Sequence, residues 1–180
     1  MDKELFNQKT VERLSSKIKL TAVQRKAAKE WLYYLDEGKL KKEKLNYLEF
    51  VEIVLKDLLG YEVKEIDFEE GNIEFSYKNK EGKTILGIEA KGTKTKSLDD
   101  EQKGYREGQE SAIIQLWTYM GNLDLEYGIA TNYKHFVLID KKKSSSRHFL
   151  NFEEVRGNEN KLKELVAIFS KEQIIDNGFI

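Results

Sequence analysis

A stretch of alternating polar and apolar residues at positions 71–92 limits most strongly what this chain can fold into. Apolar side chains occupy every second position in both of its halves, at Ile73, Phe75, Tyr77, Leu86, Ile88 and Ala90. A period of two is typical of a half-buried strand, and the turn-forming residues 79–82 lie between the halves. The stretch therefore predicts a β-hairpin with one apolar face.

The polar face of this hairpin carries charged residues that can act together. Glu89 and Lys91 are two positions apart, so their side chains leave the same side of the second strand. Glu74 lies on the first strand, on the face opposite Phe75. If the strands pair with Glu74 near Glu89, two carboxylates and one ammonium converge. Two close carboxylates repel each other unless a cation lies between them, and Mg²⁺ takes such oxygen ligands. A lysine beside them can orient or deprotonate a metal-bound water.

The same charges have a simpler interpretation, and two assignments stay open. Charged residues that alternate along an edge strand often form a solvated face without any chemistry. Asp67, on a strand expected at 61–69, competes with Glu74 for the position of the first carboxylate. We prefer Glu74 because its alternation with apolar neighbours is cleaner. Glu49 borders the apolar stripe of an expected helix and can point toward the sheet, and Glu52 is its rival.

Composition narrows the class of protein. The chain has 180 residues, enough for one domain with a core, and 35% of them are charged. It has no apolar run of membrane-spanning length and no N-terminal signal region, which indicates a cytoplasmic protein without a membrane partner. It has no cysteine for a thiolate metal site, and no proline for the Asn-Pro-Pro motif of DNA amino-methyltransferases. The net charge of −1 means that any phosphate-binding surface is local.

Apolar periodicity predicts alternating helices and strands along the chain. Helices are expected at 21–38, 41–59, 105–120 and 158–169, a second hairpin at 127–140 and a short strand at 149–155. In the helix at 41–59, the buried face is expected to include Leu48, Val51 and Leu55. The polar segments 92–104 and 141–147 are expected to be loops.

Further candidate residues lie on the helix at 105–120 and in the loop before it. Gln115 and Tyr119 are four positions apart and share one helix face. A buried amide or phenol needs a hydrogen-bonding partner, so the two residues either line the mouth of a site or form a plain surface pair. Lys94 and Lys96 can meet phosphates, although loops of this composition are usually only solvated.

The order of these features resembles the PD-(D/E)xK nuclease superfamily. The motifs that carry the resemblance are Glu49 in the first core helix, Glu74 where the family usually has Asp, Glu89-Ala90-Lys91, and Gln115-x-x-x-Tyr119. The segment 127–140 is similar to the Thr-Asn turn and apolar strand of the same domains, so the resemblance covers residues 41–140. More narrowly, the chain is similar to the N-terminal cleavage domains of type IIG restriction-modification enzymes and of the type I restriction subunit.

This resemblance implies both a fold and an activity. The fold would be α/β (α+β), with a central mixed sheet of the restriction-endonuclease type, flanked by helices and preceded by extra N-terminal helices. The activity would be that of a Mg²⁺-dependent endonuclease that hydrolyses phosphodiester bonds of double-stranded DNA, with Mn²⁺ able to substitute. The implied roles are metal binding by Glu74, Glu89 and the Ala90 carbonyl, water positioning by Lys91, assistance from Glu49, substrate or site support by Gln115 and Tyr119, and DNA binding by Lys94 and Lys96.

The expected domain organisation is a nuclease core within a larger system. Residues 1–40 would form an N-terminal helical extension, 41–157 the core, and 158–180 a C-terminal helix that leads to a further domain. No methylase or helicase motif is present, so other domains or subunits of a prokaryotic restriction-modification system would supply methylation and target recognition. Two alternatives are a non-catalytic nucleic-acid or protein interaction module on the same fold and a repair or recombination nuclease.

Overall fold

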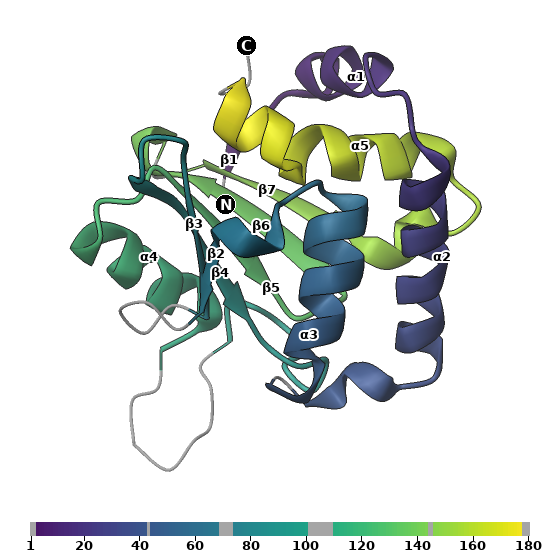
Figure 1. Ribbon diagram of the computed structural model, residues 1–180, viewed down its shortest axis with the longest axis horizontal. Coiled ribbons are helices and arrows are strands. Elements are labelled where there is room, and N and C mark those ends of the chain that lie inside the picture. Colours follow the sequence, from purple (N-terminus) through teal and green to yellow (C-terminus); the bar gives the residue numbers. More distant parts are fainter. Residues whose placement is uncertain (1–2, 43, 69–73, 101–109, 144–145, 178–180) are drawn as a thin grey trace.

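The computed structural model describes residues 3–42, 44–68, 74–100, 110–143 and 146–177, which form one mixed β-sheet with helices on both faces (Figure 1). The strands are β1 (Lys3–Glu4), β2 (Ile66–Phe68), β3 (Phe75–Lys78), β4 (Thr84–Ala90), β5 (Tyr127–Thr131), β6 (His135–Asp140) and β7 (Ser146–Asn151). Their order in the sheet is β1-β7-β6-β5-β4-β3-β2. The pairs β4–β5 and β1–β7 are parallel, and the other neighbours are antiparallel. The expected mixed sheet flanked by helices is confirmed.

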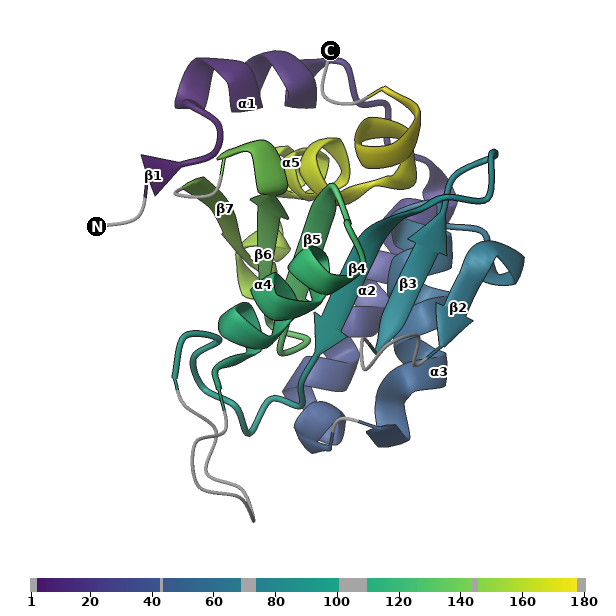
Figure 2. The ribbon, with the colours of Figure 1, turned by 90° about the vertical axis from the view of Figure 1, so that its left-hand side faces the viewer.

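The helices divide between the two faces of the sheet. They are α1 (Gln8–Ser16), α2 (Ala22–Asp36), α3 (Tyr47–Glu49), α4 (Ala112–Asn122) and α5 (Glu159–Phe169), and α3 continues directly into η3 (Phe50–Leu58). Shorter helical segments are η1 (Lys39–Lys41), η2 (Lys44–Asn46), η4 (Val63–Glu65), η6 (Lys141–Lys143), η7 (Phe152–Val155) and η8 (Glu172–Asp176). The α4 helix covers one face, and α2, α3 and α5 cover the other (Figure 2). Within the described ranges, no helix has both the length and the apolar composition needed to cross a membrane.

The predicted hairpin is formed by β3 and β4. Phe75 pairs with Ile88 and Tyr77 with Leu86, and all four side chains are at most 2% exposed. They face α3 and η3 because the alternation puts these four residues on one side of the sheet. Residues 71–73, which were predicted to begin the first strand, lie outside the described residues.

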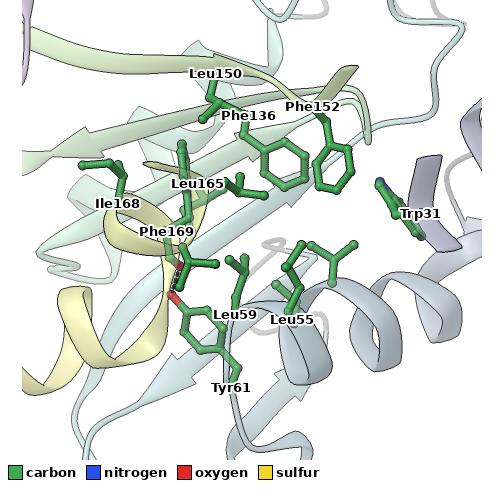
Figure 3. Close-up of a cluster of buried hydrophobic side chains, with 14 of the residues drawn as sticks. Trp31, Leu55, Leu59, Tyr61, Phe136, Leu150, Phe152, Leu165, Ile168 and Phe169 are labelled. Atoms are coloured by element: carbon green, nitrogen blue, oxygen red, sulfur yellow. Dashed lines mark hydrogen bonds between the residues drawn. The ribbon is translucent and has the colours of Figure 1, made fainter. Parts of the chain in front are cut away.

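One hydrophobic core joins the ends of the chain to the sheet. Trp31 of α2 is fully buried, and its Nε1 donates a hydrogen bond to the Tyr133 carbonyl at 2.8 Å. At the other side of the core, the Tyr61 hydroxyl donates to the carbonyl of Phe169 at the end of α5, 2.9 Å away (Figure 3). The predicted N-terminal extension and the predicted C-terminal helix therefore share the core of the sheet.

Helix α2 begins and ends where the sequence predicts. Thr21 and Gln24 form a capping box, in which each side chain accepts a hydrogen bond from the other residue's backbone N–H. Gly38, just after the helix, has a φ of 61°, a left-handed conformation that glycine adopts without steric cost.

Helix α4 lies close to the sheet at Gly128 of β5. A Cβ atom at this position would lie 2.6 Å from Met120 Sδ and 2.9 Å from Leu116 Cδ2. Real Cβ atoms essentially never show contacts this short, so a larger residue at position 128 would require the side chains of Met120 and Leu116 to move.

The prediction that Leu48 belongs to the buried face of its helix is wrong. Leu48 is 73% exposed, although Val51 and Leu55 are buried as expected. In this first turn, Tyr47 and Phe50 contact the sheet instead, with ring centroids 4.8 and 5.9 Å from that of Phe75. Two aromatic rings already occupy the surface that Leu48 was expected to cover.

Several element boundaries also differ from the prediction. The helix α4 begins at Ala112, because Ser111 caps it by accepting a hydrogen bond from Ile114 N–H; residues 105–109 lie outside the described part of the chain. Arg147, expected in a loop, belongs to β7, which pairs with both β6 and β1. The strand expected at 149–155 ends at Asn151, whose side chain caps the following η7 turn. The strand expected at 61–69 is limited to β2.

Candidate active site

The site predicted from the hairpin lies where β4 ends. Glu89 is 2% exposed and Lys91 is 7% exposed, and Lys91 Nζ lies 2.6 Å from Glu89 Oε1. The backbone N–H of Lys91 donates to the Thr131 carbonyl at 2.7 Å, which extends the pairing with β5 one residue beyond Ala90. Lys91 therefore keeps an extended conformation and projects on the same side as Glu89, where the two side chains form a buried ion pair.

Glu74 comes from the neighbouring strand at the same end of the sheet. It immediately precedes β3, whose first residue, Phe75, pairs with Ile88. The paired ladder begins at Phe75, so Glu74 is a bend residue immediately outside it, next to the Phe75–Ile88 pair and to the end of β4 that carries Glu89. Glu74 is half-buried, and its Oε2 accepts a hydrogen bond from the Tyr47 hydroxyl of α3.

The phenol of Tyr119 lies within the electrostatic field of these groups. Burial raises the pKa of Tyr119 above its usual value of 10.0, and the Glu89 carboxylate raises it further. The Lys91 ammonium opposes this shift, whereas Glu74 adds to it. The pKa of this side chain of α4 is thus influenced by all three predicted charged residues, Glu74, Glu89 and Lys91.

Gln115 lies one turn earlier on α4 and has a different local partner. Its Nε2 donates to the Glu110 carbonyl at 3.2 Å, at the start of the helix. The charged residues therefore influence the pKa of Tyr119, whereas the contact seen for Gln115 is with the backbone of its own segment.

Glu49 and Glu52 are distinguished by the orientation of their helix. Glu52 is on the outer surface, where its Oε2 lies 2.6 Å from Lys56 Nζ. Glu49 Oε2 is buried and has no hydrogen-bonding partner among the described residues. A buried carboxylate oxygen without a donor is energetically costly, so Glu49 is the better candidate for contact with a cation.

Asp67, the alternative to Glu74, is engaged elsewhere. It pairs with Ser76 in the sheet, and its carboxylate lies 2.6 Å from Lys78 Nζ. Its strand, β2, is two strands away from β4, a separation of about 10 Å. The arrangement therefore favours Glu74 as the partner of Glu89.

The loop after β4 places two lysines beside this end of the sheet. Lys94 and Lys96 are exposed, and the backbone between them is held by Asn132 Nδ2, which donates to the Thr95 carbonyl at 2.6 Å. The Thr93 N–H donates to the Leu40 carbonyl at 2.9 Å. The loop is thus fixed to the protein through its backbone, while both ammonium groups remain available to solvent.

The chemistry of the donor set suits a hard divalent cation. Glu74, Glu89 and the Ala90 carbonyl would supply oxygen atoms only, and Mg²⁺ is usually bound by one or two carboxylates together with water and substrate oxygens. Glu49 Oε2, on α3, is a further buried carboxylate oxygen. Among the described residues, no three His, Cys, Asp or Glu side chains lie close enough to form a metal-binding cluster by themselves.

No family model, curated protein or solved structure matches this chain significantly. The roles of the site residues therefore depend on the geometry and on the sequence pattern.

Sequence reasoning missed Tyr47 and assigned no role to Asn132. Tyr47 contacts Glu74 across 27 positions of sequence, and no periodic pattern relates the two. Asn132 was noticed only as a turn residue, but it is 2% exposed and its Oδ1 accepts from His135 N–H at 2.7 Å. A buried Asn after a strand is a general signal for such a turn.

A surface cavity of about 990 Å³ lies away from these residues, between α1, β7 and α5. Its lining includes His148, Lys161 and Glu164 but none of the predicted site residues. The candidate site is therefore an open end of the sheet rather than the large cavity.

Proposed function

We propose that this chain is the cleavage domain of a restriction-modification system, a Mg²⁺-dependent DNA endonuclease with a restriction-endonuclease-like fold of the PD-(D/E)xK superfamily. The observation that carries the proposal is the buried Glu89–Lys91 pair at the end of β4, with Glu74 immediately before β3, the strand that pairs with β4. An isolated buried ion pair contributes little net stability, so its presence beside a second carboxylate favours a chemical role.

The arrangement of the sheet supports this proposal. A helix carrying Glu49 precedes the β3–β4 hairpin, and the α4 crossover with Tyr119 connects β4 to the parallel strand β5. Parallel pairing requires such a crossover, which carries the chain back across the sheet to the start of β5. The two strands then run in the same direction, and β5 ends at Thr131 beside Ala90.

The proposed reaction assigns each residue a task. Glu74, Glu89 and the Ala90 carbonyl would hold Mg²⁺, which when bound lowers the pKa of its water and offsets charge on the scissile phosphate. Lys91 Nζ, held by Glu89, would orient the attacking water and stabilise the developing negative charge. Both side chains are almost completely removed from solvent, so their interactions with a phosphate are less screened than on an open surface.

Binding of double-stranded DNA would use the loop after β4. Lys94 and Lys96 project from an anchored backbone beside the proposed metal ligands, and each ammonium can neutralise one phosphate. With a net charge of −1, this surface would supply only a local attraction, and other domains or subunits would supply target recognition and methylation.

A non-catalytic interaction module on the same fold is the second candidate. It is favoured by the 2.6 Å contact between Lys91 and Glu89, in which the two charges neutralise each other, and by the lack of a three-residue metal cluster within the described residues. In such a module the pair would only fix the end of β4.

Cleavage and metal binding together separate these functions. Supercoiled plasmid is incubated with the protein in Mg²⁺ or Mn²⁺, and Mn²⁺ binding is measured by titration calorimetry. We expect wild type to bind Mn²⁺ and nick plasmid, Glu89→Gln to lose both, and Lys91→Ala to lose cleavage. Glu52→Gln, which changes an exposed carboxylate, is the matched control and should behave as wild type. Mn²⁺ binding that is absent, or unchanged in Glu89→Gln, would exclude the nuclease assignment.

A further inference from the structure

The contact between α3 and the start of β3 adds a residue to the candidate site. The Tyr47 hydroxyl donates a hydrogen bond to Glu74 Oε2, and both residues are half-buried. The ring of Tyr47 packs edge-on against Phe75, with centroids 4.8 Å apart and planes at 68°. Phe75 is fully buried and directly follows Glu74, so one aromatic contact fixes the phenol beside the carboxylate.

We propose that Tyr47 is a positioning residue that orients the Glu74 carboxylate toward the metal. This inference rests on the proposed function. A carboxylate has about four lone-pair sites, so it can accept a hydrogen bond from Tyr47 and also bind a cation. Partners of this kind restrict the rotation of a metal-binding side chain, and their loss typically weakens metal affinity 10- to 100-fold.

Orientation matters more at this position because Glu74 is a glutamate. Its side chain has one more rotatable bond than an aspartate, so more conformations must be excluded before it binds a metal. The Tyr47 bond comes from a separate element, α3, whereas Glu74 immediately precedes β3. Tyr47 thus connects the carboxylate to the helix that also carries Glu49.

The same strand supplies a matched control. Tyr77 of β3 also donates its phenolic hydrogen to a glutamate, Glu65. Tyr77 pairs with Leu86, so this contact lies further along the hairpin from the candidate site at Glu89. Burial raises the pKa of Tyr77 to about 12, and the bond to Glu65 contributes to that shift. Tyr77→Phe therefore removes a comparable phenol–carboxylate bond without touching the proposed metal ligands.

The test measures Mn²⁺ affinity by titration calorimetry in wild type, Tyr47→Phe and Tyr77→Phe, with folding checked by circular dichroism. We expect Tyr47→Phe to bind Mn²⁺ at least about 10-fold more weakly than wild type, and Tyr77→Phe to bind it unchanged. High Mn²⁺ concentration should restore plasmid cleavage by Tyr47→Phe, because only the affinity is lowered.

Other outcomes overturn the inference in distinguishable ways. Equal Mn²⁺ affinity in wild type and Tyr47→Phe, with loss in Glu89→Gln, would remove the role of Tyr47 and leave the nuclease proposal standing. Absence of Mn²⁺ binding by wild type would overturn both. If Tyr47→Phe does not fold, wild type labelled with fluorotyrosine replaces it: bound Mn²⁺ should broaden the Tyr47 resonance more than that of Tyr77, and equal broadening would contradict the proposal.

Discussion

At the scale of the residue, the Glu89–Lys91 pair is the feature with the largest expected energetic effect. Both side chains have lost nearly all contact with water, and their charged atoms are 2.6 Å apart. Desolvation opposes the attraction in such a pair, so the intact pair adds little stability. Removal of one partner is costly, because the other charge then stays buried without its counter-ion.

We expect Lys91→Met to lower the free energy of unfolding by about 3 kcal/mol, measured by urea denaturation. The double variant Glu89→Gln/Lys91→Met should recover most of this loss, since it buries no net charge. Lys78→Met, which breaks an exposed pair with Asp67, should change stability by less than about 1 kcal/mol. A Lys91→Met protein as stable as wild type would show that this carboxylate is better solvated than its burial indicates.

Sequence reasoning succeeded at residues whose relation is local. The two-residue spacing of Glu89 and Lys91 was sufficient to predict a shared face, and the structure adds that the pair is buried. The choice between Glu49 and Glu52 remained open, because it depends on how α3 and η3 rotate against the sheet. The Tyr47–Glu74 contact was not predictable, because it depends on the packing of a helix against a later strand.

At the scale of the element, a His–Glu contact connects β7 to α5. His148 Nε2 lies 3.3 Å from Glu164 Oε1, and both side chains are less than 15% exposed. The proximity of His148 and of Lys161, whose Nζ lies 2.9 Å from Glu164 Oε2, holds the pKa of Glu164 below its usual value of 4.5, although burial acts in the opposite direction. The ionised carboxylate thus stabilises the contact between strand and helix.

The stabilising effect of Glu164 should disappear in acid. Because its pKa is lower in the folded protein, its contribution is fully present above pH 4.5 and is lost as pH falls through the lower folded value. We expect Glu164→Gln to cost about 1 kcal/mol at pH 7, with the difference from wild type vanishing at low pH. Urea denaturation between pH 3 and pH 7 measures this. Glu172→Gln, at an exposed position, is the control, and a pH-independent cost of Glu164→Gln would contradict the linkage.

Elements with strong caps or a clear period were predicted well, whereas short elements defined only by tertiary pairing were not. The capping box of Thr21 and Gln24 marks α2 in the sequence itself. By contrast, β1 has two residues, too few for any alternation, and it exists because Lys3 and Glu4 pair with β7. A strand this short can be identified only from its pairing with a neighbouring strand in the structure.

At the scale of the whole molecule, the described residues before position 41 contribute side chains to the hydrophobic core. Leu14, Trp31 and Leu40 are at most 2% exposed, and they lie in one cluster with the sheet and with α5. The predicted division into an extension and a core followed the sequence motifs, which begin near residue 41. Sequence motifs show which residues are candidates for the site. The extent of a core depends instead on which helices bury the apolar faces of the sheet.

A chain lacking residues 1–40 is therefore expected not to fold. Its sheet would expose the surface covered by α2, and Tyr133 would lose the hydrogen bond from Trp31. We expect the loss of a cooperative thermal transition in circular dichroism together with increased binding of a hydrophobic dye. Val23→Ala in the full chain, at a 55% exposed position, should leave the transition nearly unchanged. A cooperative transition in the shortened chain would instead make residues 1–40 an independent unit.

The missing side chain at Gly128 has a consequence for Tyr119, the neighbour of Met120 on α4. A larger residue at position 128 would displace the side chains of Met120 and Leu116, or would separate the helix from the sheet. Tyr119 is adjacent to Met120, so a substitution at Gly128 that moved the helix would also move Tyr119. The size of the residue at position 128 could therefore affect the position of Tyr119 without any direct contact with the two glutamates.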